Sequence, residues 1–187
     1  MRVERITDLV ARLHAHPRRH LTLLVGVDGG GHPARSALVA ALAAADPGLE
    51  VVRTKDFALP PAALPASPRG AEGGRWGVDW RRLRSQVLLP LARDRPGRYQ
   101  LPDPVGELAE SREVPVGGIV VVEGFYACLK QLAALYDFRI WVEPPAGPGA
   151  ELAFGPDHDR AAGAHLRVDG SGAVEHDPWR EYVRLRG

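Results

Sequence analysis

The sequence contains a single cysteine, Cys128, among its 187 residues. One thiol excludes an internal disulfide and a cysteine-rich metal site. No apolar run approaches the roughly 20 residues that a membrane-spanning helix needs. The first residues, MRVERITDLVARLHAH, also lack the unbroken apolar core of a secretory signal. We therefore expect a cytoplasmic protein without a membrane partner.

An excess of charge of either sign is lacking as well. The net charge is +1, so no overall field points to a nucleic-acid partner. Hydrophobic residues make up 45% of the chain and charged residues 25%, which is ordinary for a globular protein. The length suits one sizeable core, and we expect a single domain over 1–187, with a core over 1–145 and a lid and C-terminal segment over 146–187. The sequence leaves open whether the protein forms a homo-oligomer.

The most informative stretch is 21–42, LTLLVGVDGGGHPARSALVAAL. An apolar, β-prone run over 21–27 leads into a glycine cluster, and a helical pattern begins near Arg35. A strand, a glycine loop and a helix form an anion site in α/β proteins, because free N–H groups and the helix dipole favour negative charge. The frame 29–36 has the first glycine and the final serine of the P-loop pattern G-x-x-x-x-G-K-[ST]. It has Ala34 in place of the second glycine and Arg35 in place of the lysine.

Strands and helices alternate along the chain, which predicts an α/β fold with a parallel sheet flanked by helices on both faces. Hydrophobic periodicity places the individual elements. The expected helices are 3–13, 36–45, 79–91, 128–136 and 179–185. The expected strands are 21–27, 50–53, 119–122 and 138–142. Irregular structure is expected over 59–76, over 97–116 and in part beyond 143.

Carboxylates stand at the ends of two of the expected strands. Asp56 follows the strand 50–53, and Glu123 follows the strand 119–122. Ligands of open α/β sheets bind at the carboxyl ends of the strands, so both residues are candidates for chemistry. A buried carboxylate is costly unless it is paired. A turn cap at Asp56 and a structural ion pair at Glu123 are the alternatives.

Five segments, in order, resemble the uridine kinase family. VGVDGGG (25–31) resembles the start of the family's P-loop, and KDF (55–57) resembles its DDFY segment. GVDWRRLRSQVLLPL (77–91) is similar to its substrate-side helix, VPVGGIVVVEGFYA (114–127) to its Walker B strand, and LYDFRIWVEPP (135–145) to the strand before its lid. The resemblance covers about 1–145. It implies a P-loop NTPase-type fold. It also implies an enzyme that uses Mg²⁺ to transfer a phosphoryl group from ATP (or GTP) to a hydroxyl of a nucleoside or a similar small molecule.

The resemblance also implies roles for single residues. Asp56 would accept the proton of the hydroxyl, and Ser36 and Glu123 would hold Mg²⁺. Arg35 would replace the catalytic, phosphate-binding lysine. The implied phosphate-binding set is Gly29, Gly30, Gly31, His32, Ala34, Arg35 and Ser36, and the implied substrate-binding set is Asp79, Arg98, Tyr99 and Asp103. The alternatives are a helix N-cap at Asp79, a turn at Asp103 and a core position at Tyr99.

The sequence departs from the family mainly at the nucleotide end. Pro33 has no N–H group within the loop whose amides should bind phosphate, and the planar fork of Arg35 differs in shape from a compact ammonium. The lid of the family is rich in arginine, whereas the segment after Val142 offers Arg160 and Arg167 before the terminal helix expected over 179–185. Three functions remain open: an active kinase, a degenerate kinase fold that binds a ligand or a partner, and a different reaction on a nucleoside-like or phosphorylated substrate.

Overall fold

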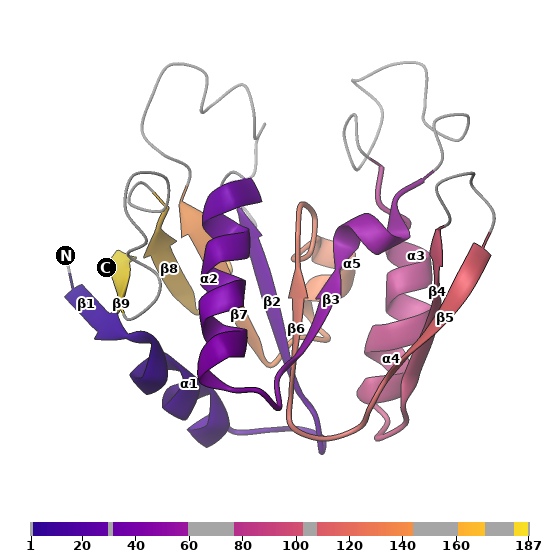
Figure 1. Cartoon of the computed structure of the whole chain (residues 1–187), viewed down its shortest axis with the longest axis horizontal. Helices are drawn as coiled ribbons and strands as arrows, with labels where there is room; N and C mark the ends of the chain where they lie inside the picture. The colour runs from indigo at the N-terminus through magenta and orange to yellow at the C-terminus, as the bar shows by residue number, and fades with distance from the viewer. Residues whose placement is uncertain are drawn as a thin grey trace.

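The computed structural model describes residues 2–29, 32–59, 77–102, 108–143, 161–170 and 182–186. Its main feature is a seven-stranded sheet with the order β1-β9-β8-β7-β2-β6-β3. Five neighbouring strands, from β8 to β3, run parallel, and β9 and β1 add two antiparallel strands at one edge (Figure 1). The strands are β1 (Arg2–Arg5), β2 (Leu23–Gly29), β3 (Glu50–Arg53), β6 (Ile119–Glu123), β7 (Phe138–Glu143), β8 (Leu166–Asp169) and β9 (Tyr182–Arg186).

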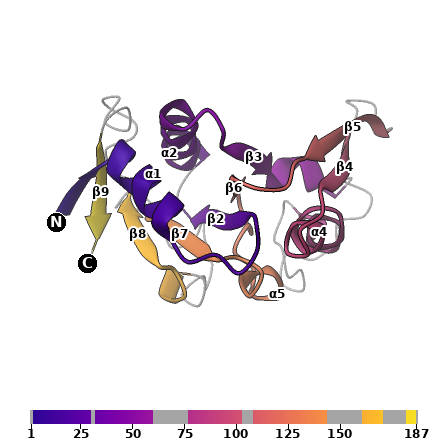
Figure 2. The same cartoon turned by 90° about the horizontal axis from the view of Figure 1, so that it is seen from below.

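The sheet is covered on both faces, which explains why β2 and β6 are apolar apart from one carboxylate each, Asp28 and Glu123. Every residue of β2 and β6 is buried. Helices α1 (Ile6–Ala15) and α2 (His32–Ala45) cover one face and pack on Leu23, Val25 and Val27. Leu24 faces the second core, which lies under α5 (Lys130–Ala133) and under the helix that begins at Trp80. Figure 2 shows α1 and α2 on one side of the sheet and α4 and α5 on the other.

The helix expected over 79–91 is present as one continuous helical rod. It consists of α3 (Trp80–Leu83), a π-helical segment (Arg84–Leu88) and α4 (Leu89–Leu91). Asp79 caps its start, because one side-chain oxygen accepts a hydrogen bond from the backbone N–H of Arg82 at 3.0 Å. Its apolar stripe packs on the second core, as the spacing predicts.

The expectation of irregular structure over 97–116 was wrong. This stretch contains an antiparallel hairpin of β4 (Gly97–Pro102) and β5 (Leu108–Val114). Buried Tyr99 lies between exposed Arg98 and Gln100, so the strand alternates with a period of two. The glycine, proline and charged residues around the hairpin concealed this pattern.

Both ends of the chain also differ from the sequence prediction. The first helix begins at Ile6, because 2–5 form β1 and pair with β9. The terminal helix expected over 179–185 was wrong for 182–185, which belong to β9. The run YVRLR alternates apolar and charged residues, and pairing with two neighbouring strands stabilises it as a strand.

The remaining elements follow the sequence prediction more closely. Strand β3 has the expected bounds, and β2, β6 and β7 lie within two residues of theirs. The α-helix expected over 128–136 is shorter and covers 130–133. In the described part of the chain, no helix has both the length and the apolar character that a membrane crossing requires.

Candidate functional site

The carboxyl ends of β2, β6 and β3 meet at one edge of the sheet. Glu123, the last residue of β6, lies opposite Val27 of β2 on one side and Arg53 of β3 on the other. A 3₁₀ turn, Thr54–Phe57, continues from β3 and carries Asp56. Helix α2 begins three residues after the end of β2 and carries Ser36. The fold therefore brings these predicted site residues to the same edge.

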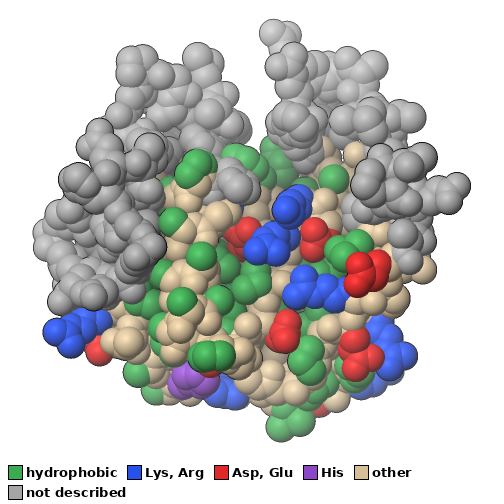
Figure 3. All heavy atoms as spheres, viewed as in Figure 1, with side chains coloured by type: hydrophobic (Ala, Val, Ile, Leu, Met, Phe, Trp, Pro, Cys, Tyr) green, Lys and Arg blue, Asp and Glu red, His purple; other side chains and the backbone are tan. Residues whose placement is uncertain are grey.

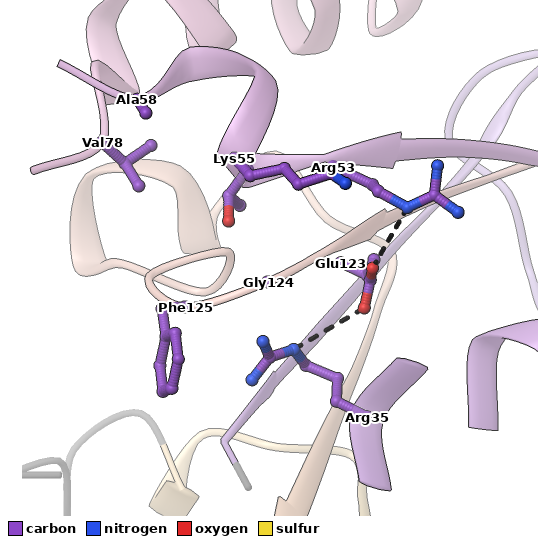
Figure 4. A pocket seen from close by; sticks show the side chains of 9 residues that line it. Arg35, Arg53, Lys55, Ala58, Val78, Glu123, Gly124 and Phe125 are labelled. Carbon is purple, nitrogen blue, oxygen red and sulfur yellow. Dashed lines mark ion pairs between the residues drawn. The ribbon is translucent and has the colours of Figure 1, made fainter. Parts of the chain in front are cut away.

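Glu123 is the centre of this edge and is only 5% exposed. The hydroxyl of Ser36 donates to its carboxylate, with Oγ 3.4 and 3.5 Å from the two oxygens. Two guanidinium groups flank the same carboxylate: Nε of Arg53 is 3.4 Å from Oε1, and Nε of Arg35 is 3.7 Å from Oε2 (Figure 4). These contacts offset the cost of burying the charge. The predicted pairing of Glu123 is thus present as an ion pair with two arginines.

Arg35 points into the protein and is 2% exposed. Its Nη1 donates a hydrogen bond to the carbonyl oxygen of Gly29 at 2.6 Å. Its guanidinium carbon lies 4.6 Å from the centre of the Phe125 ring, which is cation–π distance. The guanidinium is therefore engaged by a carbonyl, a carboxylate and a ring of the protein itself. To bind phosphate as the resemblance implies, it would have to give up part of this set.

The start of the glycine loop is fixed by Asp28, which the sequence analysis did not single out. One carboxylate oxygen of this fully buried residue accepts from the N–H of Gly29 at 2.7 Å, and the other accepts from the N–H of Cys128 at 2.9 Å. Gly29 has φ of 83°, and a Cβ atom there would collide with the carbonyl oxygen of Val142. Asp28 and Gly29 thus shape the turn that leaves β2.

Several residues of the predicted phosphate-binding set serve other purposes or lie outside the described part. Gly30 and Gly31 lie outside the described residues, and so does the side chain of His32, the first residue of α2. Ala34 is buried in the core between α1, α2 and the sheet. A Cβ atom built on Gly170 would lie 3.4 Å from the Cβ of Ala34, so Ala34 packs near the end of β8.

Asp56 is held from two directions. Its Oδ2 accepts a hydrogen bond from the hydroxyl of Tyr99 at 3.2 Å, and its backbone carbonyl accepts from Nη2 of Arg82 at 3.0 Å. Burial raises the pKa of Tyr99 to about 12, Arg112 opposes this shift, and the negative charge of Asp56 adds to it. Tyr99 therefore stays protonated and remains a donor to Asp56. The sequence placed both residues near the substrate but not in contact with each other.

Of the other predicted substrate residues, Asp79 lies next to this edge, because its backbone N–H donates to the carbonyl oxygen of Phe57 at 2.7 Å. Asp79 uses its side chain as the cap of α3. Arg98 is exposed on the β4–β5 hairpin, where its guanidinium pairs with Glu113 at 2.7 Å. Asp103 lies outside the described residues. Their substrate roles stay predictions.

A cavity of about 220 Å³ opens beside Glu123, between β3, β6 and the start of α3. Figure 4 shows its lining, and Figure 3 shows basic and acidic side chains together at the centre of the molecular face. We call it the β3–β6 pocket, and its lining residues are Arg35, Arg53, Thr54, Lys55, Ala58, Val78, Glu123, Gly124 and Phe125. The sequence analysis missed Arg53, Lys55 and Phe125, although each lies within three residues of the end of β3 or β6.

Ser36 and Glu123 offer the types of oxygen ligand that suit a magnesium ion. Hydroxyl and carboxylate oxygens are the hard ligands that Mg²⁺ prefers, and one or two carboxylates with waters and substrate phosphates suffice. The described residues include no cluster of three histidine, cysteine or acidic side chains that would hold a metal on its own. A metal here would therefore rely on this pair together with oxygens of a bound phosphate.

Comparison with known proteins supports the fold. No family model matches the chain, and no curated protein matches it. Among solved structures, one described as a possible uridine kinase from Bacillus stearothermophilus is similar, with a TM-score of 0.62 and 16% sequence identity. The match covers 87% of this chain and 96% of that chain. The chain thus has a P-loop NTPase-like α/β fold, and at this level of identity the likeness concerns the fold alone.

Proposed function

We propose that the protein is a phosphotransferase that uses ATP (or GTP) and Mg²⁺ to phosphorylate a hydroxyl of a small molecule. The observation that carries this proposal is the contact of Ser36 with Glu123, 3.4 Å apart at the edge where Asp56 also lies. A hydroxyl and a carboxylate for the metal, with a second carboxylate for the proton, are among the recurring parts of phosphoryl-transfer sites. The shared fold with a possible uridine kinase supports the same class of reaction.

In this proposal Asp56 would accept the proton of the acceptor hydroxyl while the hydroxyl oxygen bonds to the γ-phosphorus of the nucleotide. The bond from that phosphorus to the β-phosphate oxygen would break, and the nucleoside diphosphate would leave. Tyr99 donates to one carboxylate oxygen of Asp56, so the other oxygen is the one that receives the proton. Arg82 fixes the backbone of Asp56 and thereby the position of the base. Bound nucleotide and metal would supply the phosphoryl group and neutralise its charge. Ser36 and Glu123 would orient that metal.

A second candidate is a protein that binds a ligand without transferring a phosphoryl group. The inward position of Arg35 favours it. This guanidinium already bonds to Gly29, and Asp28 already engages the N–H of Gly29. The Arg35 guanidinium and the Gly29 N–H both belong to the segment that the resemblance assigns to phosphate binding.

Calorimetry with nucleotide separates the two candidates. We expect magnesium-dependent binding of ATP or GTP to the full chain that is weakened by Ser36→Ala. Ser85→Ala is a matched control, because the hydroxyl of Ser85 contacts only its own helix among the described residues. Absence of heat with either nucleotide would exclude the phosphotransferase and leave the ligand-binding protein.

A further inference from the structure

We infer that the β3–β6 pocket binds a small anion with an apolar body, and that the acceptor belongs to this class rather than to the neutral nucleosides. The second part rests on the proposed phosphotransferase function. The first part concerns only what the pocket binds. The cavity of about 220 Å³ lies below the roughly 300 to 1,000 Å³ of sites for drug-sized ligands, so it suits a body about the size of one ring.

The walls of the pocket are apolar. Ala58 and Val78 line one side, joined by a β-bridge between their backbones, and Phe125 lines another (Figure 4). The backbone of Gly124 lies between Phe125 and Glu123, with the side chain of Thr54 packed against it. These surfaces favour burial of an apolar group, because they offer few partners for hydroxyl groups.

The charges around the pocket favour an anion. Three lining residues are basic and one is acidic. The single carboxylate, Glu123, is already flanked by Arg35 and Arg53. Lys55 is exposed, makes no ion pair with any described residue, and extends its side chain toward Arg53, so its charge adds to the positive charge on that side of the pocket (Figure 4).

The side chains predicted to hydrogen-bond a neutral, hydroxyl-rich substrate are engaged by other groups of the protein. Asp79 caps α3, and the hydroxyl of Tyr99 is buried against Asp56. Arg98 pairs with Glu113 on the exposed hairpin. What the described part of the pocket offers is therefore an apolar wall beside positive charge.

Binding of a matched pair of probes to the full chain, without nucleotide, tests the ligand class. The probes are 4-(hydroxymethyl)benzoate and the neutral 1,4-benzenedimethanol, which share a ring and a hydroxymethyl group and differ in charge; uridine is the third ligand. Ligand-observed NMR titration should show the benzoate binding about fivefold more tightly than the neutral probe, with a preference that weakens in high salt. Equal or tighter binding of the neutral probe or of uridine would overturn the inference.

Variants locate the effect. Lys55→Gln should reduce the preference for the benzoate, whereas Lys130→Gln should not, since these are the two lysines of the chain and Lys130 lies on α5. Ala58→Gln places a bulkier, uncharged side chain at the exposed wall and should weaken both probes. An unchanged preference in Lys55→Gln would contradict the inference, provided that thermal melts show a folded variant.

Turnover is a separate readout. Phosphorylation of 4-(hydroxymethyl)benzoate in the presence of Mg²⁺ and ATP would support both parts of the inference. Selective binding of the benzoate without turnover of any acceptor would remove the phosphotransferase and the acceptor assignment together. The anion-binding pocket would still stand, so the two failures are distinguishable.

Discussion

The guanidinium of Arg35 bonds to the carbonyl oxygen of Gly29, six residues earlier, and so braces the turn between β2 and α2 from the inside. The same group lies beside the buried carboxylate of Glu123. In this position Arg35 stabilises the turn through contacts with the protein itself. The consequences are measurable in stability as well as in binding.

Arg35→Ala should lower the free energy of unfolding by about 3 kcal/mol or more, because it leaves a buried carboxylate with one partner fewer and a buried carbonyl without its donor. Arg53→Ala is the matched comparison, since Arg53 pairs with the same carboxylate but its side chain is 47% exposed. Its loss should cost no more than about 1 kcal/mol. Urea titrations of the two variants would measure both values. Equal losses would mean that burial of Arg35 does not matter.

Asp56→Asn should abolish turnover and leave ligand-induced melting shifts intact, because an amide cannot accept the proton of the hydroxyl. Initial rates and thermal melts with the same ligands would check both parts. Residual turnover close to that of the wild type would mean that Asp56 is not the base.

Tyr99→Phe tests the positioning of that base. Removing the hydroxyl deletes its hydrogen bond to Asp56, and a bond to a charged group contributes roughly 1.5 to 3 kcal/mol. We expect kcat to fall about tenfold or more with little change in KM. A purely structural role would instead lower the melting temperature and leave kcat per folded molecule unchanged.

Gly124→Ala should destabilise the fold more than Gly117→Ala. Both glycines have positive φ, 141° and 97°, so both substitutions carry backbone strain of about 1 to 3 kcal/mol. A Cβ atom at Gly124 would also collide with Oγ1 of Thr54, whereas one at Gly117 would have no atom within 4 Å. Denaturant titrations of the two variants isolate the steric part. Similar losses would show that Thr54 moves aside without cost.

His165 should make stability depend on pH in the acidic range. Burial, with repulsion from Arg139 and His16, lowers its pKa below the ordinary 6.5. As the pH falls, His165 therefore takes up a proton in the unfolded chain before it does so in the folded protein. The contribution of neutral His165 to the free energy of unfolding is complete above about pH 6.5, and it declines as the pH falls from there through the folded pKa. Between about pH 7.5 and about pH 5, the melting temperature of His165→Asn should fall less steeply than that of the wild type or of His20→Asn. Parallel curves would exclude the effect.

The central architecture could be predicted because it depends on local patterns. The apolar runs of β2 and β6 indicate buried strands, and Asp79 before a helical stripe indicates an N-cap. Since parallel strands end at a common edge, the sequence also indicates that Asp56 and Glu123 lie at one edge of the sheet. These inferences need only the order of elements and the rule for strand ends.

What could not be predicted depends on contacts between distant residues. The direction of Arg35 is set by Gly29, Glu123 and Phe125, none of which reveals from sequence that it will surround a guanidinium. The contact of Tyr99 with Asp56 depends on the β4–β5 hairpin, whose alternation is hidden among charged residues. Strand β9 likewise depends on two partners far away in the chain.

The pairing of β1 with β9 joins the earliest described strand to the latest one. Among the described strands β9 is the only partner of β1, so β1 has no neighbour in the sheet until β9 has been synthesised. The edge of β8 that faces away from β7 is likewise unpaired until β9 has been synthesised. Closing that side is therefore a step of high contact order, and the edge of β8 stays open to intermolecular strand pairing until β9 is in place.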